Sequence, residues 1–183
     1  MAQYYFDIET TGLNPQEDKI ISIQIQELDR NTGEKVGELI ILKEWESSEK
    51  EILEEFILGS GVLEYPFNFI PVGYNLGFEH NFLMERTKIN NLPCVDILDN
   101  PFIDLHSIGI LMNNGEFKGS GLDKITGKKS DGSSLPTWYK NKEFDKILDY
   151  VKLEADEFIK LNLWLRKKMP ELLTEFKKEN GIN

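Results

Sequence analysis

The sequence lacks most features that mark secreted and membrane-bound proteins. Its 183 residues include one cysteine, Cys94, which excludes an internal disulfide framework and suits a reducing compartment. No stretch reaches the roughly 18 consecutive apolar residues that a membrane-spanning helix needs. We therefore expect a cytoplasmic protein with no membrane-bound part, and the length suits one domain with a sizeable core.

Basic residues are also scarce, since 21 Lys and Arg stand against 32 Asp and Glu, for a formal net charge of −11. This balance argues against avid, non-specific binding of nucleic acid. It does not exclude a metal-dependent nuclease, because such a site is itself a cluster of carboxylates and its ions supply the positive charge. The balance reverses between Lys118 and Lys146. That segment is either a solvated lysine-rich loop or a phosphate-facing lip beside an acidic pocket.

The pattern of apolar residues predicts an α/β fold. Three strands, joined by turn-forming residues, should form an antiparallel meander, and two short strands follow. The expected strands span residues 3–8, 19–28, 36–42, 69–74 and 101–104. Helical spacing of apolar residues predicts helices among and after these strands. The expected helices span residues 48–59, 76–88, 122–125 and 143–165. The fold class we expect is a mixed five-stranded sheet with helices on both faces.

Two segments near the end of the chain carry further expectations. Residues 115–136 are rich in Gly, Ser and Lys, which predicts a mobile loop around one short helix. Pro170 should interrupt the last long helix, because proline cannot donate a helical hydrogen bond. We therefore expect one domain over residues 1–168 and a C-terminal helical extension of the same domain over residues 169–183.

Asp7 and Glu9 end the first predicted strand. Residues two apart on a strand point to the same face of the sheet. An unpaired buried carboxylate is costly, and a metal ion such as Mg²⁺ or Mn²⁺, which favours oxygen ligands, would relieve that cost. The alternative is that the strand end is exposed and that both acids are merely solvated.

Two later segments place further polar groups where helices begin or turn. Asn75 could cap the helix over residues 76–88, and Glu79 lies near its first turn. Tyr150 and Glu154 share one helix face, so they could bind a metal and position its water together. Taken alone, each segment also fits an ordinary capping acid or a half-buried tyrosine beside a solvated glutamate.

Three motifs in this order resemble those of the DEDD 3′–5′ exonuclease superfamily, which has an RNase H-like fold. The matching segments are FDIETTGLNP, VGYNLGFEHNFL and ILDYVKLEADEFIKL. The third is similar to the tyrosine form found in proofreading domains of family B DNA polymerases. The histidine form would need a histidine on the last helix, and the two histidines, His80 and His106, lie elsewhere. The resemblance covers roughly residues 3–165.

The sequence departs from the family at two of its four acids. The matching residues are Asp7, Glu9, Glu79 and Glu154, so glutamate replaces both later aspartates. Glutamate places its carboxylate roughly 1.5 Å further from the backbone than aspartate does. Such a change matters because Mg²⁺ binds oxygen ligands at about 2.0–2.1 Å in a strict geometry. The replacements indicate either a pocket whose helices stand further back or a loss of catalysis. Asp156 is a poor substitute for Glu154 because it points to nearly the opposite side of the helix.

The resemblance implies a metal-dependent exonuclease that releases nucleoside monophosphates from 3′ ends of single-stranded DNA or RNA, or from short oligonucleotides. It implies two Mg²⁺ or Mn²⁺ ions on the four acids, with Tyr150 orienting a water molecule. It also implies that Thr10, Thr11, Gly12 and Leu13 bind the terminal nucleotide, and we place Asn75 and Phe78 in the same substrate-binding set. Phe78 could stack on a base, as could Trp138, or each could simply pack in the core or a loop. The alternative is a weakened or inactive module that binds nucleic acid or a protein. The sequence indicates neither DNA nor RNA, and no oligomeric state.

Overall fold

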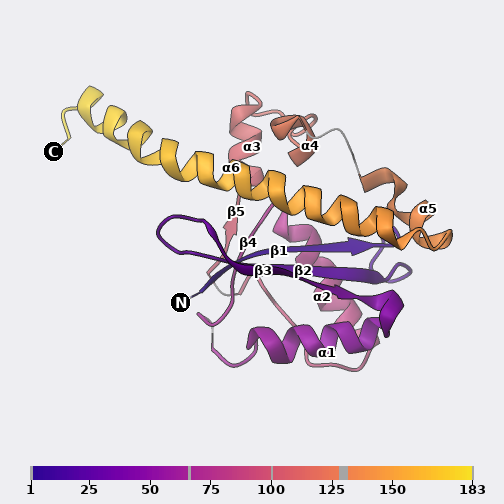
Figure 1. The fold of residues 1–183 in the computed structure, drawn as a ribbon. Helices are drawn as coiled ribbons and strands as arrows, with labels where there is room; N and C mark the ends of the chain where they lie inside the picture. Colours follow the sequence, from indigo (N-terminus) through magenta and orange to yellow (C-terminus); the bar gives the residue numbers. More distant parts are fainter. Residues whose placement is uncertain (1, 66, 100, 128–131, 183) are drawn as a thin grey trace.

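The computed structural model describes residues 2–65, 67–99, 101–127 and 132–182, which form a mixed sheet covered by helices (Figure 1). The five strands lie in the order β3-β2-β1-β4-β5. They are β1 (Gln3–Thr10), β2 (Ile20–Leu28), β3 (Lys35–Lys43), β4 (Ile70–Gly73) and β5 (Ile103–Asp104). The first three strands form the predicted antiparallel meander, while β4 and β5 extend the sheet in parallel from β1. The predicted fold class is confirmed.

One face of the sheet is covered by α1 (Glu49–Ser60) and α2 (Leu76–Ile89). Alternate residues of β1 point to this face, so Phe6 and Ile8 are buried among apolar residues of both helices. The ring of Phe6 stacks on that of Phe56 in α1 at a centroid distance of 5.2 Å. Ser48 caps α1 by accepting the Glu51 N–H at 3.2 Å.

The opposite face is covered by the part of the chain that follows β5 (Figure 1). Its helices are α3 (His106–Met112), α4 (Leu122–Thr126), α5 (Leu135–Lys140) and α6 (Phe144–Glu179). Single turns of 3₁₀ helix precede α1 at Glu44–Glu46 and α5 at Gly132–Ser134. The other β1 residues point here, and Tyr5 packs on Phe158 of α6 with ring centroids 4.8 Å apart. Because α6 runs across β1, its inward side chains meet those of the strand.

The helix α6 does not break at Pro170, so the expected interruption is wrong. Proline removes one helical hydrogen bond, the bond that its own N–H would make to the carbonyl of Arg166. From Met169 to Ile182 every residue is exposed, so water can satisfy such a freed carbonyl. The helix therefore continues past the sheet as a solvent-surrounded rod (Figure 1).

The segment 115–136 contains more helix than the single turn expected from its composition. The predicted short helix is present as α4, but α5 begins at Leu135 with Pro136 in its first turn, where proline is tolerated. Lys128, Lys129 and Asp131, part of the proposed lysine-rich lip, lie outside the described residues. Of the helices in the described ranges, none is long and apolar enough to cross a membrane.

Candidate metal centre

The strand β1 carries Asp7 and Glu9 on the face that α6 covers. It lies between β2 and β4, with Asp7 opposite Gln24 and Glu9 opposite Ser22 of β2. The pairing register shifts between Glu9 and Thr10, which marks an irregularity of the β-bulge kind. Bulges often lie beside active sites, where they redirect side chains. Glu9 therefore lies where the regular pairing of β1 ends, and Asp7 lies two residues before it.

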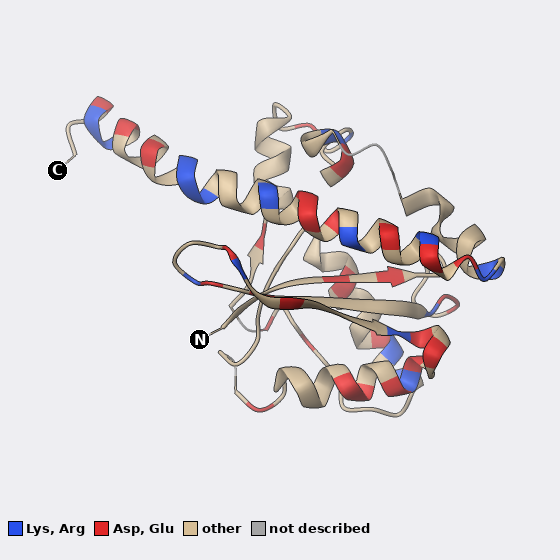
Figure 2. Ribbon diagram, in the orientation of Figure 1, with Lys and Arg blue, Asp and Glu red and all other residues tan. Residues whose placement is uncertain are grey.

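A third acid reaches this pair from α6. One carboxylate oxygen each of Asp7, Glu9 and Glu154 all lie within 4.8 Å of one another. Figure 2 shows acidic residues both at the end of β1 and along the stretch of α6 that crosses the sheet. Asp156 is directed elsewhere and forms an ion pair with Lys35 at the start of β3. The predicted convergence of distant acids thus holds for these three, and Glu154, not Asp156, contributes the third.

Glu79 lies beside this cluster in the first turn of α2. Its side chain is 4% exposed, and its Oε2 atom has no hydrogen-bond partner within the described parts of the chain. Burial, followed by the negative charge of Asp7, raises the pKa of Glu79 well above its usual value. Its oxygens do not belong to the mutually close set that the other three acids form. Glu79 is therefore a buried neighbour of the cluster, and the negative charge of the cluster acts on its carboxyl group.

Tyr150 lies one helical turn before Glu154, as the sequence predicts. Burial raises the pKa of its phenol, and the charges of Glu9 and Glu154 and a hydrogen bond with Glu154 add to this effect. The hydroxyl therefore remains protonated at neutral pH and acts as a donor. Trp138 of α5 contacts Tyr150 edge to face, with ring centroids 6.3 Å apart, so this tryptophan packs beside the site.

Tyr5 is a member of this site that the sequence reasoning missed. It is 2% exposed, and burial raises the pKa of its phenol, with additional contributions from all four acids. The alternation of β1 could have revealed it, because Tyr5 lies two residues before Asp7 and so shares its face. Its apolar neighbours made it indistinguishable from an ordinary core aromatic in the sequence.

This set of side chains fits a hard divalent cation. The donors are carboxylate oxygens, the ligands that Mg²⁺ and Mn²⁺ prefer. Like charges this close repel strongly, and the buried Glu79 oxygen lacks a partner in the described protein. A cation would relieve both costs. Asp7, Glu9 and Glu154 would hold it, and Glu79 is a further buried carboxylate beside them.

The turn after β1 is held in shape by its own polar groups. Thr10 donates a hydrogen bond from Oγ1 to the Gly12 carbonyl at 2.6 Å, and the hydroxyl of Thr11 lies 3.3 Å from Oδ1 of Asp18. A side chain at Gly12 would place its Cβ 2.3 Å from a carboxylate oxygen of Asp18, so any other residue here would displace the Asp18 carboxylate from the turn. The residue that follows, Leu13, is 85% exposed.

Leu13 and Phe78, two of the predicted substrate-binding residues, border the same surface cavity of about 340 Å³. Phe78 is half-buried, and its ring lies 4.8 Å from that of Phe82 in α2. The cavity therefore has one exposed apolar wall on the turn and one aromatic wall on α2.

Asn75 takes the predicted N-cap position of α2, but its side chain makes no capping hydrogen bond. The residue has φ of 70°, in the left-handed region, where asparagine is tolerated. Asp104 supplies the cap instead, since its carboxylate accepts the N–H groups of Asn75 at 2.8 Å and Leu76 at 3.0 Å. The expected capping contact was wrong because the neighbouring strand β5 supplies a longer-range acceptor.

Neither histidine belongs to the cluster that Asp7, Glu9 and Glu154 form. His80 has its Nδ1 3.2 Å from Oδ1 of Asp96. The Nε2 of His106 lies 2.9 Å from Oγ of Ser120 and so ties α3 to the segment before α4. His106 also borders the cavity that Asp7 and Glu154 line.

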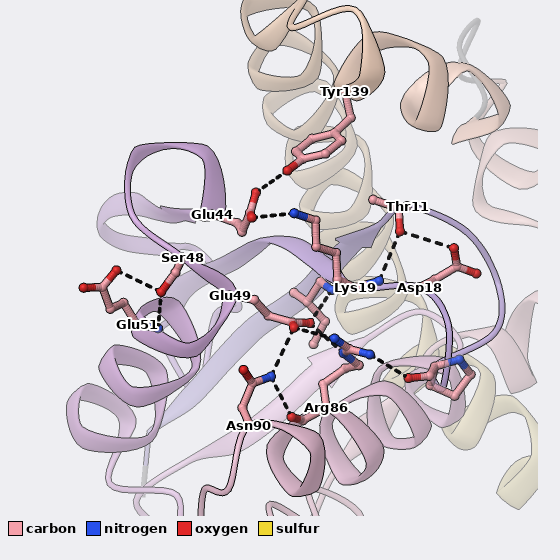
Figure 3. Close-up of polar contacts among 12 residues, drawn as sticks. Thr11, Asp18, Lys19, Glu44, Ser48, Glu49, Glu51, Arg86, Asn90 and Tyr139 are labelled. Atoms are coloured by element: carbon pink, nitrogen blue, oxygen red, sulfur yellow. Dashed lines mark hydrogen bonds and ion pairs between the residues drawn. The ribbon is translucent and has the colours of Figure 1, made fainter.

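A second polar network links the turn to α5 (Figure 3). Lys19 donates to Oε1 of Glu44 at 2.6 Å, and the Tyr139 hydroxyl donates to the other oxygen of Glu44 at 2.5 Å. The ammonium of Lys19 also lies 5.0 Å from the centre of the Tyr139 ring. These contacts hold α5 beside the start of β2, close to the turn that follows β1.

Comparison with known proteins identifies relatives of this fold. An uncharacterized protein of Methanocaldococcus jannaschii is 31% identical over 94 residues, which are 50% of this chain and 45% of that protein. A crystal structure of Escherichia coli exonuclease I with a dT13 oligonucleotide matches 95% of this chain and 43% of its own, at 13% identity and a TM-score of 0.58. The zinc-bound form of the exonuclease I complex with single-stranded DNA gives a TM-score of 0.61 at 14% identity, over 95% of this chain and 42% of its own. This chain spans less than half the length of each relative.

These structural matches, at such low identity, show a shared fold. The family itself is identified by a sequence profile that matches residues 4–146, well over half of the chain. That range contains β1 with Asp7 and Glu9, and α2 with Glu79. The chain belongs to the RNase H superfamily.

Proposed function

We propose that this chain is a divalent-metal-dependent 3′–5′ exonuclease that hydrolyses terminal phosphodiesters of single-stranded nucleic acid and releases nucleoside monophosphates. The observation that carries the proposal is the approach of Asp7, Glu9 and Glu154, from two elements far apart in sequence, to within 4.8 Å of one another. An RNase H-like sheet that presents such a cluster at the end of its first strand is suited to metal-assisted phosphoryl chemistry.

The residues of the chain take distinct roles in this proposal. The acid cluster would hold Mg²⁺ or Mn²⁺, and such ions lower the pKa of a bound water and stabilise charge on a transferring phosphate. Tyr150, a protonated donor, would orient the attacking water molecule from beside Glu154. Leu13 and Phe78 would contact the terminal base from the two walls of their cavity. Backbone groups of Thr10, Thr11 and Gly12 would support the terminal nucleotide.

The structural relatives agree with a single-stranded substrate. The exonuclease I structures that share this fold contain a dT13 oligonucleotide or single-stranded DNA. The net charge of −11 favours short or locally bound substrates over long duplexes gripped through many phosphates. We therefore include short oligonucleotides of DNA or RNA among the proposed substrates.

A second candidate function is a module that binds nucleic acid or a protein and hydrolyses weakly or not at all. The observation that favours it is the position of Glu79, whose longer side chain lies beside the acid cluster without joining it. A site that holds its metal with three close carboxylates would bind the ion less tightly than a site with four.

A direct assay separates the two functions. The purified protein is incubated with 5′-labelled single-stranded DNA and RNA, in Mg²⁺ and in Mn²⁺, beside Asp7→Ala and a variant outside the site, Leu58→Ala. A stepwise ladder that is retained by Leu58→Ala and lost in Asp7→Ala supports the exonuclease. Binding without a ladder in either metal supports the module. We expect faster hydrolysis in Mn²⁺, which tolerates looser coordination.

The length of the substrate is a separate variable in the same assay. Rates on dinucleotides and on 20-residue strands should be compared at equal concentrations of 3′ ends. Higher rates on dinucleotides would make this an enzyme for short oligonucleotides, and the reverse would favour a strand-trimming nuclease.

We also propose that residues 1–168 form the exonuclease domain and that residues 169–183 extend it. Every residue from Met169 to Ile182 is exposed, so this end of α6 buries little against the sheet. A variant that ends at Lys168 should keep the melting temperature and hydrolysis rate of the full chain.

A further inference from the structure

Tyr5 is a buried residue that borders the same cavity as the acids Asp7 and Glu154. It lies on β1, with Asp7 two residues later on the same face, and its ring packs on Phe158 of α6. Packing alone would be satisfied by phenylalanine, because the ring makes the apolar contacts. The hydroxyl is the feature that needs an explanation.

That hydroxyl has no partner in the described protein. Its oxygen is buried, and it makes no hydrogen bond with any group in the described ranges. Buried hydroxyl groups nearly always make hydrogen bonds, since an unmade bond costs the full desolvation of the group. An unpartnered buried donor beside a cluster of acids therefore points to an acceptor that is bound from outside.

The space for such an acceptor is present. Tyr5 borders a cavity of about 360 Å³ together with Asp7, Asn75 and Glu154. Two of these residues, Asp7 and Glu154, belong to the acid cluster, so a ligand held by the cluster would extend into this cavity. The cavity is large enough for several water molecules or for a phosphate group.

We propose that the Tyr5 hydroxyl donates a hydrogen bond to an oxygen atom held in this cavity beside Asp7 and Glu154, either a water molecule that accompanies the cation or a phosphate oxygen of the nucleotide. Tyr5 is then a positioning residue of the site, a second phenol that approaches it from the strand while Tyr150 approaches from the helix. This inference rests on the metal site of the proposed function, and it assigns the Tyr5 hydroxyl to ligand binding while the ring packs in the core.

The test compares Tyr5→Phe with Tyr4→Phe. Tyr4 is the neighbouring tyrosine on the same strand, but it points to the other face, stacks on Phe69 and borders a different cavity. Thermal unfolding of the metal-free proteins is measured first. Calorimetric titrations with Mn²⁺ alone, and with a nucleoside 5′-monophosphate in saturating Mn²⁺, then measure binding to each variant.

Tyr5→Phe should melt at or above the temperature of the wild type, because the lost hydroxyl had no partner. It should bind one of the two ligands about 3- to 10-fold more weakly, as the loss of one hydrogen bond predicts, while Tyr4→Phe binds both normally. A loss with Mn²⁺ alone identifies the water molecule, and a loss confined to the monophosphate identifies the phosphate oxygen.

Two results would overturn the inference about Tyr5. One is wild-type affinity for both ligands in Tyr5→Phe, and the other is a lower melting temperature of the metal-free variant, which would give the hydroxyl a structural partner. Both leave the proposed nuclease standing if the wild type binds Mn²⁺ and produces the ladder. A wild type that binds no Mn²⁺ would remove both proposals, whereas Mn²⁺ binding without a ladder removes only the nuclease.

Discussion

Arg86 and Glu49 form a bidentate ion pair in the protein interior, with Nε–Oε1 and Nη2–Oε2 distances of 2.8 and 2.6 Å (Figure 3). The pair joins α2 to the first turn of α1. Each partner also holds a further segment, since Glu49 accepts the Ile20 N–H at 2.8 Å and Arg86 donates to the Pro15 carbonyl at 3.2 Å. The ion pair therefore fixes the turn that presents Leu13.

Removal of Arg86 alone should destabilise the protein strongly. In Arg86→Met the Glu49 carboxylate, which is 8% exposed, would stay buried without its cation. Breaking a buried pair in this way typically costs about 3–5 kcal/mol of unfolding free energy. Urea denaturation at pH 7 measures the change. A loss below about 1 kcal/mol would show that water replaces the guanidinium at Glu49.

The matched control for this prediction is the double variant Glu49→Gln with Arg86→Met. Glutamine keeps an acceptor for the Ile20 N–H but carries no charge, so the double variant should recover more than half of the stability that the single variant loses. A double variant as unstable as Arg86→Met would assign the loss to packing and to the Pro15 contact.

Glu79→Gln should stabilise the metal-free protein at neutral pH. Burial raises the pKa of Glu79 above the unfolded value near 4.5, so the folded state keeps a proton that the unfolded state releases. Stability therefore falls as the pH rises from about 4.5 towards the raised folded pKa. The variant escapes this loss and should melt roughly 2–6 °C higher at pH 7, with no difference below pH 4. Melting curves from pH 4 to pH 8, in chelator, test the sign.

Mn²⁺ should raise the melting temperature of the wild type more than that of Glu79→Gln. A cation beside Glu79 favours its charged form, so added Mn²⁺ should stabilise the wild type more than Glu79→Gln. An equal Mn²⁺-induced shift in melting temperature for both proteins would show that Glu79 does not contribute to the metal site.

Tyr150→Phe should lower the rate of hydrolysis without weakening the metal site. The phenol is hydrogen-bonded to Glu154, but the variant keeps the ring that packs against Trp138. Loss of a water-orienting donor should reduce kcat roughly 10- to 100-fold. Single-turnover rates and Mn²⁺ titrations separate the two effects, with Tyr139→Phe as a comparison because its hydroxyl contacts Glu44 outside the acid cluster. A fall in Mn²⁺ affinity equal to the fall in rate would make Tyr150 a support of Glu154 only.

Leu13→Ala should raise KM for oligonucleotides and leave the fold intact. Leu13 is 85% exposed, so truncation removes little buried surface. If its side chain supports the terminal base opposite Phe78, KM should rise about 3- to 10-fold while the melting temperature stays unchanged. Leu58→Ala, an equally apolar change at a residue of α1 that is 81% exposed, is the control. Equal KM values for the two variants would contradict a role for Leu13 in substrate binding.

The sequence predicted the sheet well because its signals are local. Alternation along residues 19–28 and turn residues at 31–34 specify strands and a hairpin without reference to the rest of the chain, and both are present. The interruption expected at Pro170 was wrong because this part of α6 is exposed throughout. Water can therefore satisfy the carbonyl that loses its helical donor to proline. The cap of α2 was missed because its acceptor, Asp104, comes from a strand about 30 residues later.

The sequence predicted that the acids converge, but it did not predict which other residues surround them. Motif order brought out Asp7, Glu9 and Glu154, whose convergence depends on β1 and α6 crossing in space. Tyr5 was missed because a buried strand with an aromatic residue looks the same whether the hydroxyl faces protein or a cavity. Alternation along β1 places Tyr5, and not Tyr4, on the face of Asp7, but only the structure shows that Tyr5 borders a cavity beside the acids.

Glu154→Asp should weaken metal binding, although aspartate is the residue that the resembled family carries there. In this chain the longer glutamate already brings its oxygen within 4.8 Å of those of Asp7 and Glu9. Shortening it by one methylene withdraws the oxygen by roughly 1.5 Å. A movement of α6 towards the sheet could restore the distance, but the packed side chains of Phe158 and Val151 resist that movement. Mn²⁺ affinity should therefore fall about 10-fold or more by calorimetry, and Glu154→Gln should fall at least as far. Tighter binding by the aspartate variant would instead mean that the glutamate is a weakening replacement, and it would favour the binding module over the nuclease.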